Sequence, residues 1–422
     1  MVRPLHHKTN LDNHIRIITE RIEHVKSVSV GIWVNVGSRD EHPGEEGISH
    51  LIEHMIFKGT ARRDALQIAK EIDQVGGMSN AFTSKEFTCF HARVMSDHLS
   101  RVTDLLADIF LDSRFDPEDL ERERQVILQE IKMVEDTPDE MIHILFAQSL
   151  WPDDPVGRPV MGTYDTVSSI DREEIKQYLA RTYRPPKIVI AAAGDLEHQA
   201  IVDLMAPAFA SLPAGPPSRP GPRPRARTGI HVVQKDLEQV HLCLGGTFPD
   251  VMDQRRYVAA LLNVILGGNM SSRLFQEIRE KRGLAYSVYS FFSPYMGTGM
   301  LGVYAGVDPQ RTEVTRLTLA ELAKLRDGQL EEPELIAARE HLRGSVILAS
   351  ESVDNRMTRL AKNEITYQRY IDFEEVLAAI DGVTLNKVVA LADEYLQTDS
   401  LNLTVLGPIR EDQLPVDLLH QV

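Results

Sequence analysis

Two histidines and a glutamate lie close together in the segment Gly47-Ile-Ser-His50-Leu-Ile-Glu53-His54. In an α-helix, His54 would lie about 40° around the axis from His50, and Glu53 about 60° to the other side. Two imidazoles one turn apart can hold a zinc ion, and the adjacent carboxylate can reach a metal-bound water. The pattern H-x-x-E-H is the inverted form of a metalloprotease motif. Two surface histidines on an amphipathic helix would give the same spacing.

A catalytic zinc ion usually has three protein ligands, so the two histidines are an incomplete set. A helix predicted over residues 116–134, with Asp116 as its N-cap and Pro117 in its first turn, could supply the third ligand. One face of this helix carries Leu120, Glu123, Val126, Ile127, Glu130, Met133 and Val134. A carboxylate among core-facing residues is costly unless it is paired or bound to a metal. Glu123 and Glu130 are therefore candidates and Glu135 is another; alternatively, both stripe glutamates lie at a solvated edge.

The composition narrows the class of protein. The 422 residues suggest two or more domains, and 43% hydrophobic with 26% charged residues is normal for a soluble globular protein. A net charge of −16 disfavours a nucleic-acid surface. Cys89 and Cys243 lie in separate apolar runs and are expected to be reduced and buried. The first residues contain no apolar signal segment, and no run approaches the roughly 18 residues of a membrane span, so we expect a cytoplasmic protein.

A proline-rich stretch divides the chain nearly in half. Leu212–Arg227 contains prolines that forbid regular helix or central strand, so it reads as an extended linker. Its arginines at 219, 223, 225 and 227 lack neighbouring aromatic residues, which favours a solvated linker over a site for an anionic partner. The expected division is a catalytic domain at 1–211, a linker at 212–228 and a second domain at 229–422.

The two halves have similar patterns. In the first, a strand at 87–95 precedes a helix at 97–110 and a second helix that begins near Asp116. In the second, a strand at 300–307 precedes a helix at 308–325 and another that begins near 330. Residues 27–36 alternate between apolar and other types, as in a half-buried strand. These patterns predict an α+β fold made of two homologous α/β-sandwich (roll) domains that arose by internal duplication.

The chain resembles the pitrilysin/insulinase/mitochondrial-processing-peptidase family of zinc peptidases, in particular its short bacterial members. Five stretches carry the resemblance and follow one another in the family's order. They are Gly47–Thr60, Asn80–Glu86, Glu121–Ile131, Pro155–Gly162 and Ser271–Tyr286. The resemblance extends over essentially the whole chain.

The resemblance implies a role for several residues. His50, His54 and Glu130 would bind one Zn²⁺ ion per chain, with Glu123 supporting them from behind. Glu53 would be the general base. Asn80, Ala81 and Phe82 would belong to the edge strand that binds substrate, and Arg279 with Tyr286 would contact the substrate and the transition state. Grouped by implied role, the catalytic residues are Glu53, Tyr286 and Arg279. The metal-binding residues are His50, His54 and Glu130, and the substrate-binding residues are Asn80, Ala81 and Phe82.

The resemblance also implies an assembly. Longer members of the family contain four such domains that close like a clamshell, so this chain would form half of one. We therefore expect a homodimer in which zinc from one subunit faces Arg279 and Tyr286 of the other, around a chamber that admits peptides or unstructured polypeptide segments. A subunit that needs a related partner chain, or a non-catalytic scaffold of the same fold, is the alternative. No nucleic-acid or membrane partner is expected.

Overall fold

The structure is a computed structural model that describes residues 6–215, 221, 223–309, 313–410 and 419. Residues 216–220 and 222 of the expected linker, Arg219 included, lie outside the described residues. The described linker residues 213–215 and 223–228 form neither helix nor strand, which agrees with the proline content. The expected helix start near Asp308 also falls partly outside, since residues 310–312 are not described.

The chain forms two compact units, and neither is continuous in sequence. Unit 1 comprises Met1–Lys132, Arg158–Pro220 and Leu348–Tyr370. Unit 2 comprises Met133–Gly157, Gly221–Ile347 and Ile371–Val422. Each half of the sequence therefore contributes one segment to the unit built mainly by the other half. A division at the linker alone does not anticipate this exchange.

Unit 1 is built on a six-stranded mixed sheet with the order β1-β2-β6-β3-β5-β4. Its strands are β1 (His6–Asn10), β2 (Arg16–Arg21), β3 (Ser27–Val34), β4 (Met78–Thr83), β5 (Thr88–Met95) and β6 (Ile188–Gly194). Strands β2 and β6 are parallel, and the other neighbouring pairs are antiparallel. Strand β4 ends the sheet, so one of its sides has no neighbouring strand.

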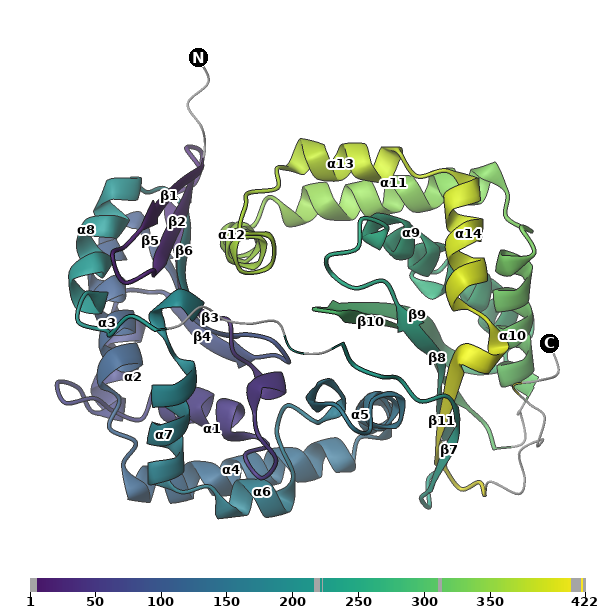
Figure 1. The fold of residues 1–422 in the computed structure, drawn as a ribbon, viewed down its shortest axis with the longest axis horizontal. Coiled ribbons are helices and arrows are strands. Elements are labelled where there is room, and N and C mark those ends of the chain that lie inside the picture. The colour runs from purple at the N-terminus through teal and green to yellow at the C-terminus, as the bar shows by residue number, and fades with distance from the viewer. Residues whose placement is uncertain (1–5, 216–220, 222, 310–312, 411–418, 420–422) are drawn as a thin grey trace. The chain divides into compact units, whose positions relative to one another are not determined.

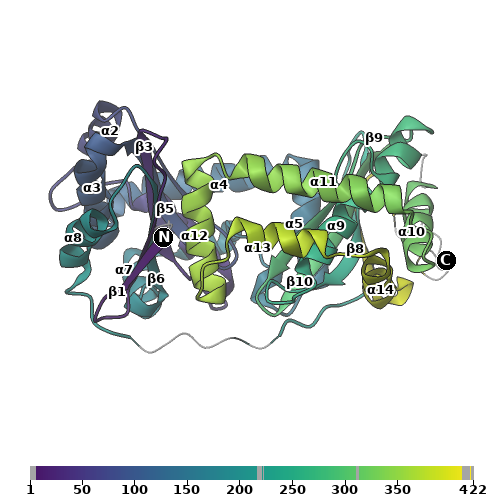
Figure 2. The same cartoon turned by 90° about the horizontal axis from the view of Figure 1, so that it is seen from above.

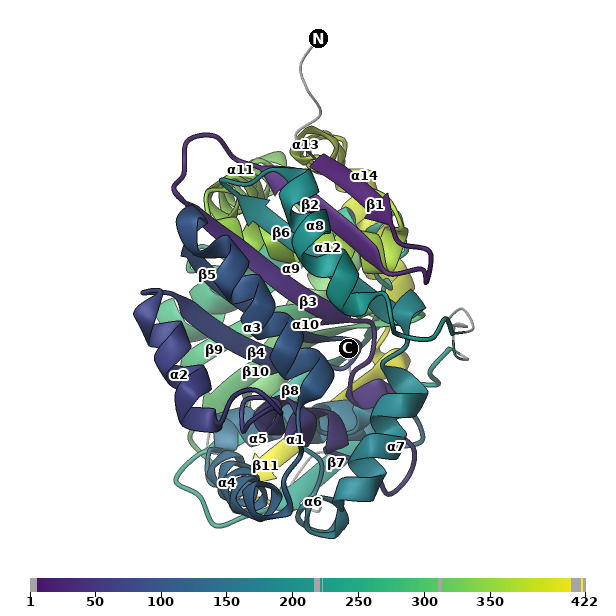
Figure 3. The ribbon, with the colours of Figure 1, turned by 90° about the vertical axis from the view of Figure 1, so that its left-hand side faces the viewer.

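Helices cover both faces of this sheet. Helices α3 (Leu99–Asp112) and α8 (His198–Phe209) pack on one face, as Figure 3 shows face-on. Helix α12 (Val353–Tyr367), from the C-terminal half of the chain, packs on the other (Figure 1). The prediction that residues 27–36 form a half-buried strand was therefore wrong on one point. Strand β3 is buried on both faces, because α12 covers Trp33 and its neighbours.

A third group of helices lies beyond the end of β3. These helices are α1 (Ile48–Met55), α4 (Pro117–Glu135), α6 (Tyr164–Ser169) and α7 (Arg172–Thr182). They share a core in which Ile52, Ile127 and Tyr178 are fully buried. Asp116 caps α4 as expected, since its carboxylate accepts the Glu118 N–H at 3.0 Å. Helix α2 (Ala65–Gln74) follows α1 along the chain.

Unit 2 is built on a five-stranded sheet with the order β7-β11-β8-β10-β9. Its strands are β7 (Gly229–Gln234), β8 (Val240–Phe248), β9 (Ala285–Tyr295), β10 (Thr298–Val307) and β11 (Leu401–Gly407). Helices α9 (Arg256–Gly267), α10 (Glu313–Arg326) and α14 (Leu385–Tyr395) pack on one face of the sheet. Helix α5 (Pro138–Leu150), from the N-terminal half, packs on the other face.

Two further helices belong mostly to unit 2. They are α11 (Glu332–Ala349) and α13 (Phe373–Asp381), which run side by side in Figure 1 and Figure 2. The two cysteines are free and buried, one in each unit, as expected. None of the helices in the described parts of the chain has the length and apolar character needed to cross a membrane.

The two sheets repeat one another. The strand order β2-β6-β3-β5-β4 corresponds to β7-β11-β8-β10-β9, and the parallel pair β2–β6 corresponds to the parallel pair β7–β11. Helices α5 and α12 occupy the same place in this repeat, because each follows a long helix and covers the remaining face of a sheet. This correspondence agrees with the predicted α+β fold of two duplicated domains.

The contact between α12 and β3 generates a first prediction. The Trp33 Nε1–H donates to the Met357 sulfur at 3.1 Å, and both side chains are fully buried. Met357→Ala should therefore lower the free energy of unfolding of unit 1 by about 2–4 kcal/mol through the cavity it leaves. Chemical denaturation followed by tryptophan fluorescence measures the change. Met270→Ala is the matched control because Met270 is 73% exposed, and an equal loss in both variants would contradict the packing described here.

Candidate metal centre

Helix α1 presents the H-x-x-E-H residues as the spacing predicted. The His50 and His54 rings lie with their centroids 4.7 Å apart at an interplanar angle of 70°. Apolar residues Leu51, Ile52 and Met55 of the same helix are fully buried against unit 1, so the histidines occupy the remaining, partly open side. Amphipathic packing of α1 therefore sets the direction in which both imidazoles point.

The end of α1 is held next to the start of α4 by backbone contacts. The Arg114 N–H donates to the Gly59 carbonyl at 3.0 Å, and Thr60 forms an isolated β-bridge with Ser113. These contacts join the segment that follows His54 to the segment that precedes α4. A ligand on α4 can therefore come within reach of two ligands on α1, although about 75 residues separate them in sequence.

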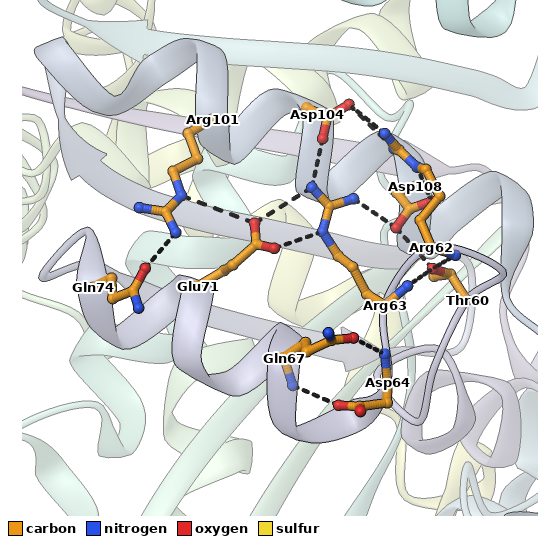
Figure 4. A network of polar contacts seen from close by, with 10 residues as sticks. All are labelled: Thr60, Arg62, Arg63, Asp64, Gln67, Glu71, Gln74, Arg101, Asp104 and Asp108. Atoms are coloured by element: carbon orange, nitrogen blue, oxygen red, sulfur yellow. Dashed lines mark hydrogen bonds and ion pairs between the residues drawn. The ribbon is translucent and has the colours of Figure 1, made fainter.

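A network of ion pairs fixes the same segment (Figure 4). The buried Asp108 carboxylate on α3 accepts hydrogen bonds from Thr60 Oγ1 at 2.8 Å, Arg62 Nε at 2.8 Å and Arg63 Nη1 at 2.7 Å. Burial opposes ionisation of this carboxyl, but these donors lower the pKa of Asp108. Arg63 also pairs with Glu71 on α2 and Asp104 on α3. Because the contacts are charge-assisted and share one buried carboxylate, they hold the α1–α2 connection rigidly on α3.

Glu130 on α4 completes a cluster with the two histidines. Its Oε2 lies 3.9 Å from His50 Nε2 and 3.7 Å from His54 Nε2. The ligand atoms of His50, His54 and Glu130 all lie within 4.8 Å of one another. Among the described residues, no other group of three or more His, Cys, Asp or Glu side chains meets this distance. Of the three glutamates considered from the sequence, Glu130 joins the histidines, Glu123 lies behind them and Glu135 is not part of the cluster.

The predicted stripe on α4 was partly wrong. Leu120 and Ile127 are buried as expected, but Val126 is 40% and Met133 is 61% exposed, while Ile131 is buried in their place. The buried face is therefore rotated relative to the predicted one, because Leu120, Ile127 and Ile131 pack into the core that α4 shares with α1, α6 and α7. Glu123 lies inside this face with 12% of its side chain exposed, and Glu130 at its edge with 35% exposed.

Glu123 holds one of the two imidazoles. Its Oε2 lies 3.2 Å from His54 Nδ1, and its Oε1 pairs with Lys58 Nζ at 2.7 Å. A carboxylate on Nδ1 favours the tautomer with the proton there, which leaves the Nε2 lone pair directed toward Glu130. By contrast, His50 Nδ1 is buried without a hydrogen-bond partner in the described part of the structure. The two imidazoles are thus supported unequally.

The donor set fits a zinc ion. Zinc takes imidazole nitrogen and carboxylate oxygen at about 2.0–2.2 Å, which in a tetrahedron separates two ligand atoms by about 3.3–3.6 Å. The separations of 3.7 and 3.9 Å from Glu130 need only a small contraction to reach that range. Burial, with the nearby His54 charge as a smaller contribution, lowers the pKa of His50 to about 4, so this imidazole is neutral at pH 7 and able to donate its lone pair.

Glu53 lies beside the cluster without joining it. Its Oε2 accepts a hydrogen bond from Thr83 Oγ1 at 2.7 Å. Burial raises the pKa of Glu53, and the Thr83 hydrogen bond partly opposes that rise. A carboxylate in this setting is a stronger base than one in water, which suits a group that must take up and release a proton.

Residues Asn80, Ala81 and Phe82 lie on β4, the edge strand next to α1. The Ser84 N–H donates to the Phe87 carbonyl, so Ser84 and Phe87 form a hydrogen-bonded pair of the antiparallel ladder. Hydrogen-bonded pairs alternate along such a ladder, so the backbone groups of Asn80 and Phe82 bond to β5. The backbone N–H and C=O of Ala81 then point to the outer side of the edge strand. The Ala81 N–H is capped by the neighbouring Asn80 side chain at 2.9 Å. An additional extended strand could pair with this edge once the Asn80 side chain releases the Ala81 N–H.

Arg279 and Tyr286 belong to unit 2 and contact one another there. The Arg279 guanidinium lies 4.5 Å from the centroid of the Tyr286 ring and 4.8 Å from that of Phe275. Arg279 is in a π-helical turn, Phe275–Glu280, and Tyr286 lies at an irregularity of β9 where the pairing with β10 shifts register. The register shift turns the Tyr286 ring outward, and it is 80% exposed.

Two contacts beside the cluster were not predicted from the sequence, although Thr83 belongs to the segment expected to pair with substrate. Thr83 donates to Glu53, and Lys58 neutralises Glu123. Thr83 directly follows the predicted edge-strand residues, so its position was a usable signal, but its partner on α1 was not. Lys58 lies four residues after His54, and nothing in its spacing distinguishes it from a solvated lysine.

Comparisons with known proteins can now be set beside this geometry. Residues 16–164 match the family described as "Insulinase (Peptidase family M16)". Residues 169–342 match the family described as "Peptidase M16 inactive domain". The first match contains the whole His50, His54, Glu130 cluster, and the second contains Arg279 and Tyr286.

Relatives match over nearly their whole length. An uncharacterized zinc protease of Streptomyces coelicolor is 40% identical over 415 residues, which are 96% of this chain and 90% of the relative. An uncharacterized zinc protease of Bacillus subtilis is 38% identical over 397 residues, which are 94% of this chain and 97% of the relative.

Solved structures share the fold at lower identity. A protease from Helicobacter pylori superposes with a TM-score of 0.90 and 23% identity, covering 96% of this chain and 100% of that one. A peptidase M16 inactive domain from Pseudomonas fluorescens gives a TM-score of 0.90 at 21% identity, covering 96% and 98%. Two family matches that together cover most of the sequence, and relatives near 40% identity along its length, lead to one conclusion: the chain belongs to the insulinase family of peptidases, M16.

Proposed function

We propose that the protein is a zinc-dependent endopeptidase that hydrolyses peptides or unstructured polypeptide segments. The observation that carries the proposal is the meeting of His50, His54 and Glu130, with Glu53 beside them and an open strand edge next to the same helix. Two relatives with "zinc protease" in their names support the choice of metal and reaction class.

In this proposal each residue has a distinct task. His50, His54 and Glu130 would hold the zinc ion, which when bound would act as a Lewis acid that lowers the pKa of water and polarises a carbonyl. Glu53 accepts a proton from the attacking water and later delivers it to the leaving amine. Thr83 orients the Glu53 carboxylate through its hydroxyl hydrogen bond. Glu123 keeps His54 in the tautomer that presents Nε2 to the cluster.

The substrate class follows from the edge of β4. An extended peptide that pairs with the backbone of Ala81 would add a seventh strand to the six-stranded sheet of unit 1. Such pairing reads backbone groups and tolerates many side chains, while Asn80 and Phe82 flank the pairing site. Folded proteins do not offer a free extended segment, so unstructured chains are the expected substrates.

Arg279 and Tyr286 are proposed to contact the substrate and the oxyanion. A guanidinium and a phenol held against each other, with the phenol exposed, provide donors suited to a developing negative charge. We propose that the pair acts on the zinc site of a second copy of the chain, in a homodimer that encloses the reaction. The cytoplasmic location expected from the sequence stays a prediction.

A non-catalytic role is the second candidate. It is favoured by one observation, the similarity of the fold to a protein titled a peptidase M16 inactive domain. The complete set of His50, Glu53, His54 and Glu130 favours the enzyme, because a scaffold needs none of these groups to be aligned.

Substitution of Glu53 tests the reaction directly. Glu53→Gln should lower kcat/KM on a quenched fluorescent peptide library by about 10²–10⁴-fold while zinc content stays that of the wild type, because only the proton acceptor is lost. Thr83→Val should lower kcat by about tenfold, and Thr83→Ser, which keeps the donor, should restore it. A purified, zinc-loaded wild-type protein with no turnover would instead favour the scaffold role.

The role of Glu123 predicts a change in metal affinity. Glu123→Gln should weaken zinc binding by about 10–100-fold, because the His54 tautomer is no longer held by a carboxylate. Competition with a chromophoric chelator measures the dissociation constant. Glu118→Gln is the matched control, since Glu118 is on the same helix with 87% of its side chain exposed. Equal affinity in the Glu123→Gln and Glu118→Gln proteins would contradict the assignment.

Mixing two inactive variants tests the dimer. His50→Ala removes the zinc site, and Arg279→Ala removes the proposed partner group, so each variant alone should be inactive. If each site combines zinc from one chain with Arg279 from another, a refolded equal mixture should recover about a quarter of the wild-type activity, because half of the dimers are mixed and each has one intact site. Recovery should be absent if both groups of a site come from the same chain.

A further inference from the structure

Helix α1 begins without a cap of its own. The residue at its N-cap is Gly47, with φ of 93°, so it has no side chain that could accept a hydrogen bond. A Cβ at this position would lie 2.5 Å from the Met161 carbonyl oxygen, and a Cβ on Gly162 would lie 2.2 Å from that of Glu46. Two backbone segments thus touch at the start of the helix. The serine, threonine or aspartate that usually caps a helix has no room here.

Glu41 supplies the missing cap from six residues upstream. Its Oε2 accepts the Gly47 N–H and its Oε1 accepts the Ser49 N–H, each at 3.0 Å. The residue is only 3% exposed, so these bonds form away from solvent. Both oxygens of one carboxylate therefore hold the first turn of α1. That turn contains His50, the third residue of the helix.

The loop that carries Glu41 is itself anchored to unit 1. The Ser38 N–H donates to the Ser84 carbonyl at 3.1 Å, and the Arg39 N–H donates to the Lys85 carbonyl at 2.8 Å. The Arg158 guanidinium donates to the Glu41 carbonyl at 3.2 Å. Ser84 follows Thr83, the residue that orients Glu53. The loop that carries Ser38, Arg39 and Glu41 thus joins the turn after β4 to the start of the helix that carries the proposed metal ligands.

The rest of α1 shows why this contact matters for His50 in particular. Glu123 supports His54 through Nδ1, but His50 Nδ1 is buried with no hydrogen-bond partner in the described residues. Among the described residues, no hydrogen bond to Nδ1 therefore orients the His50 ring. Its place is set by the backbone of the first turn, and that backbone is held by Glu41.

We propose that Glu41 is a positioning residue of the metal centre, which places His50 relative to His54 and Glu130 by holding the first turn of α1 through both carboxylate oxygens. The inference rests on the proposed function only in requiring that the cluster binds zinc. It predicts that the loss of one acceptor weakens metal binding, although Glu41 touches none of the three ligands.

Zinc affinity of the full chain tests this role without reference to turnover. In Glu41→Gln one oxygen is replaced by an amide NH₂, which cannot accept the N–H that faces it. Zinc binding, measured by chelator competition, should weaken by about tenfold or more. Glu45→Gln is the matched control in the same loop, because the Glu45 carboxylate pairs with Arg181 and not with α1. All measurements use one pH above 8, where Glu41 is a carboxylate, since burial raises the pKa of Glu41 to about 8.

A second pair of variants separates positioning from general loss of stability. Met357→Ala destabilises unit 1 where α12 packs on β3, in a cluster that includes none of the three proposed ligands, and should leave zinc affinity unchanged. Glu41→Asp, whose carboxylate is one methylene shorter, is milder and should show an intermediate affinity and an altered visible absorption spectrum with Co²⁺. If folded Glu41→Gln and Glu41→Asp keep the wild-type zinc affinity and Co²⁺ spectrum, the role of Glu41 is overturned and the proposed function is not. Failure of the wild type to bind zinc would overturn the proposed function together with it.

Discussion

The candidate metal centre depends on one constraint: side chains from two helices must meet although each helix is packed for other reasons. His50 and His54 lie on the open side of α1, and Glu130 lies at the edge of the buried face of α4. The distance between the helices is fixed by the backbone contacts of Gly59 with Arg114 and of Thr60 with Ser113. Asp108 then holds Thr60, Arg62 and Arg63 on α3, so the connection cannot drift. These contacts therefore set how far the three side chains of the cluster can move relative to one another.

The part of the site that lies within a single helix was predictable from the sequence. A spacing of three and four residues puts His50, Glu53 and His54 on one side of any helix, whatever that helix packs against. The place of Glu130 was not predictable in this way, since the apolar stripe of α4 also included Val126 and Met133, which the structure exposes. Only the resemblance to a known family separated Glu130 from Glu123 and Glu135. Glu41 carries no pattern at all, because its partners are backbone N–H groups reached through a loop.

The fold shows the same division between local and long-range information. Alternating apolar residues predicted β3 as a strand, and the order of elements predicted two similar halves. The same alternation suggested that one face of β3 was exposed. It is covered by α12, which lies more than 300 residues later. An amphipathic helix shows in its sequence that it covers an apolar surface, but not which one. The sequence does not show that α12 packs on the sheet of unit 1 and α5 on the sheet of unit 2. Only the three-dimensional structure shows which sheet each helix covers.

The exchange of α12 has a consequence for the order in which the protein forms on the ribosome. Residues 353–367 are synthesised long after β2, β3, β5 and β6, yet they pack on one face of that sheet. Until they emerge, the face that contains Trp33, Cys89 and Val189 is uncovered, while the helices that carry His50, His54 and Glu130 have already been synthesised. Translation of almost the entire chain must therefore precede completion of the N-terminal unit. Through most of synthesis the apolar face that α12 covers therefore stays exposed and open to non-native contacts.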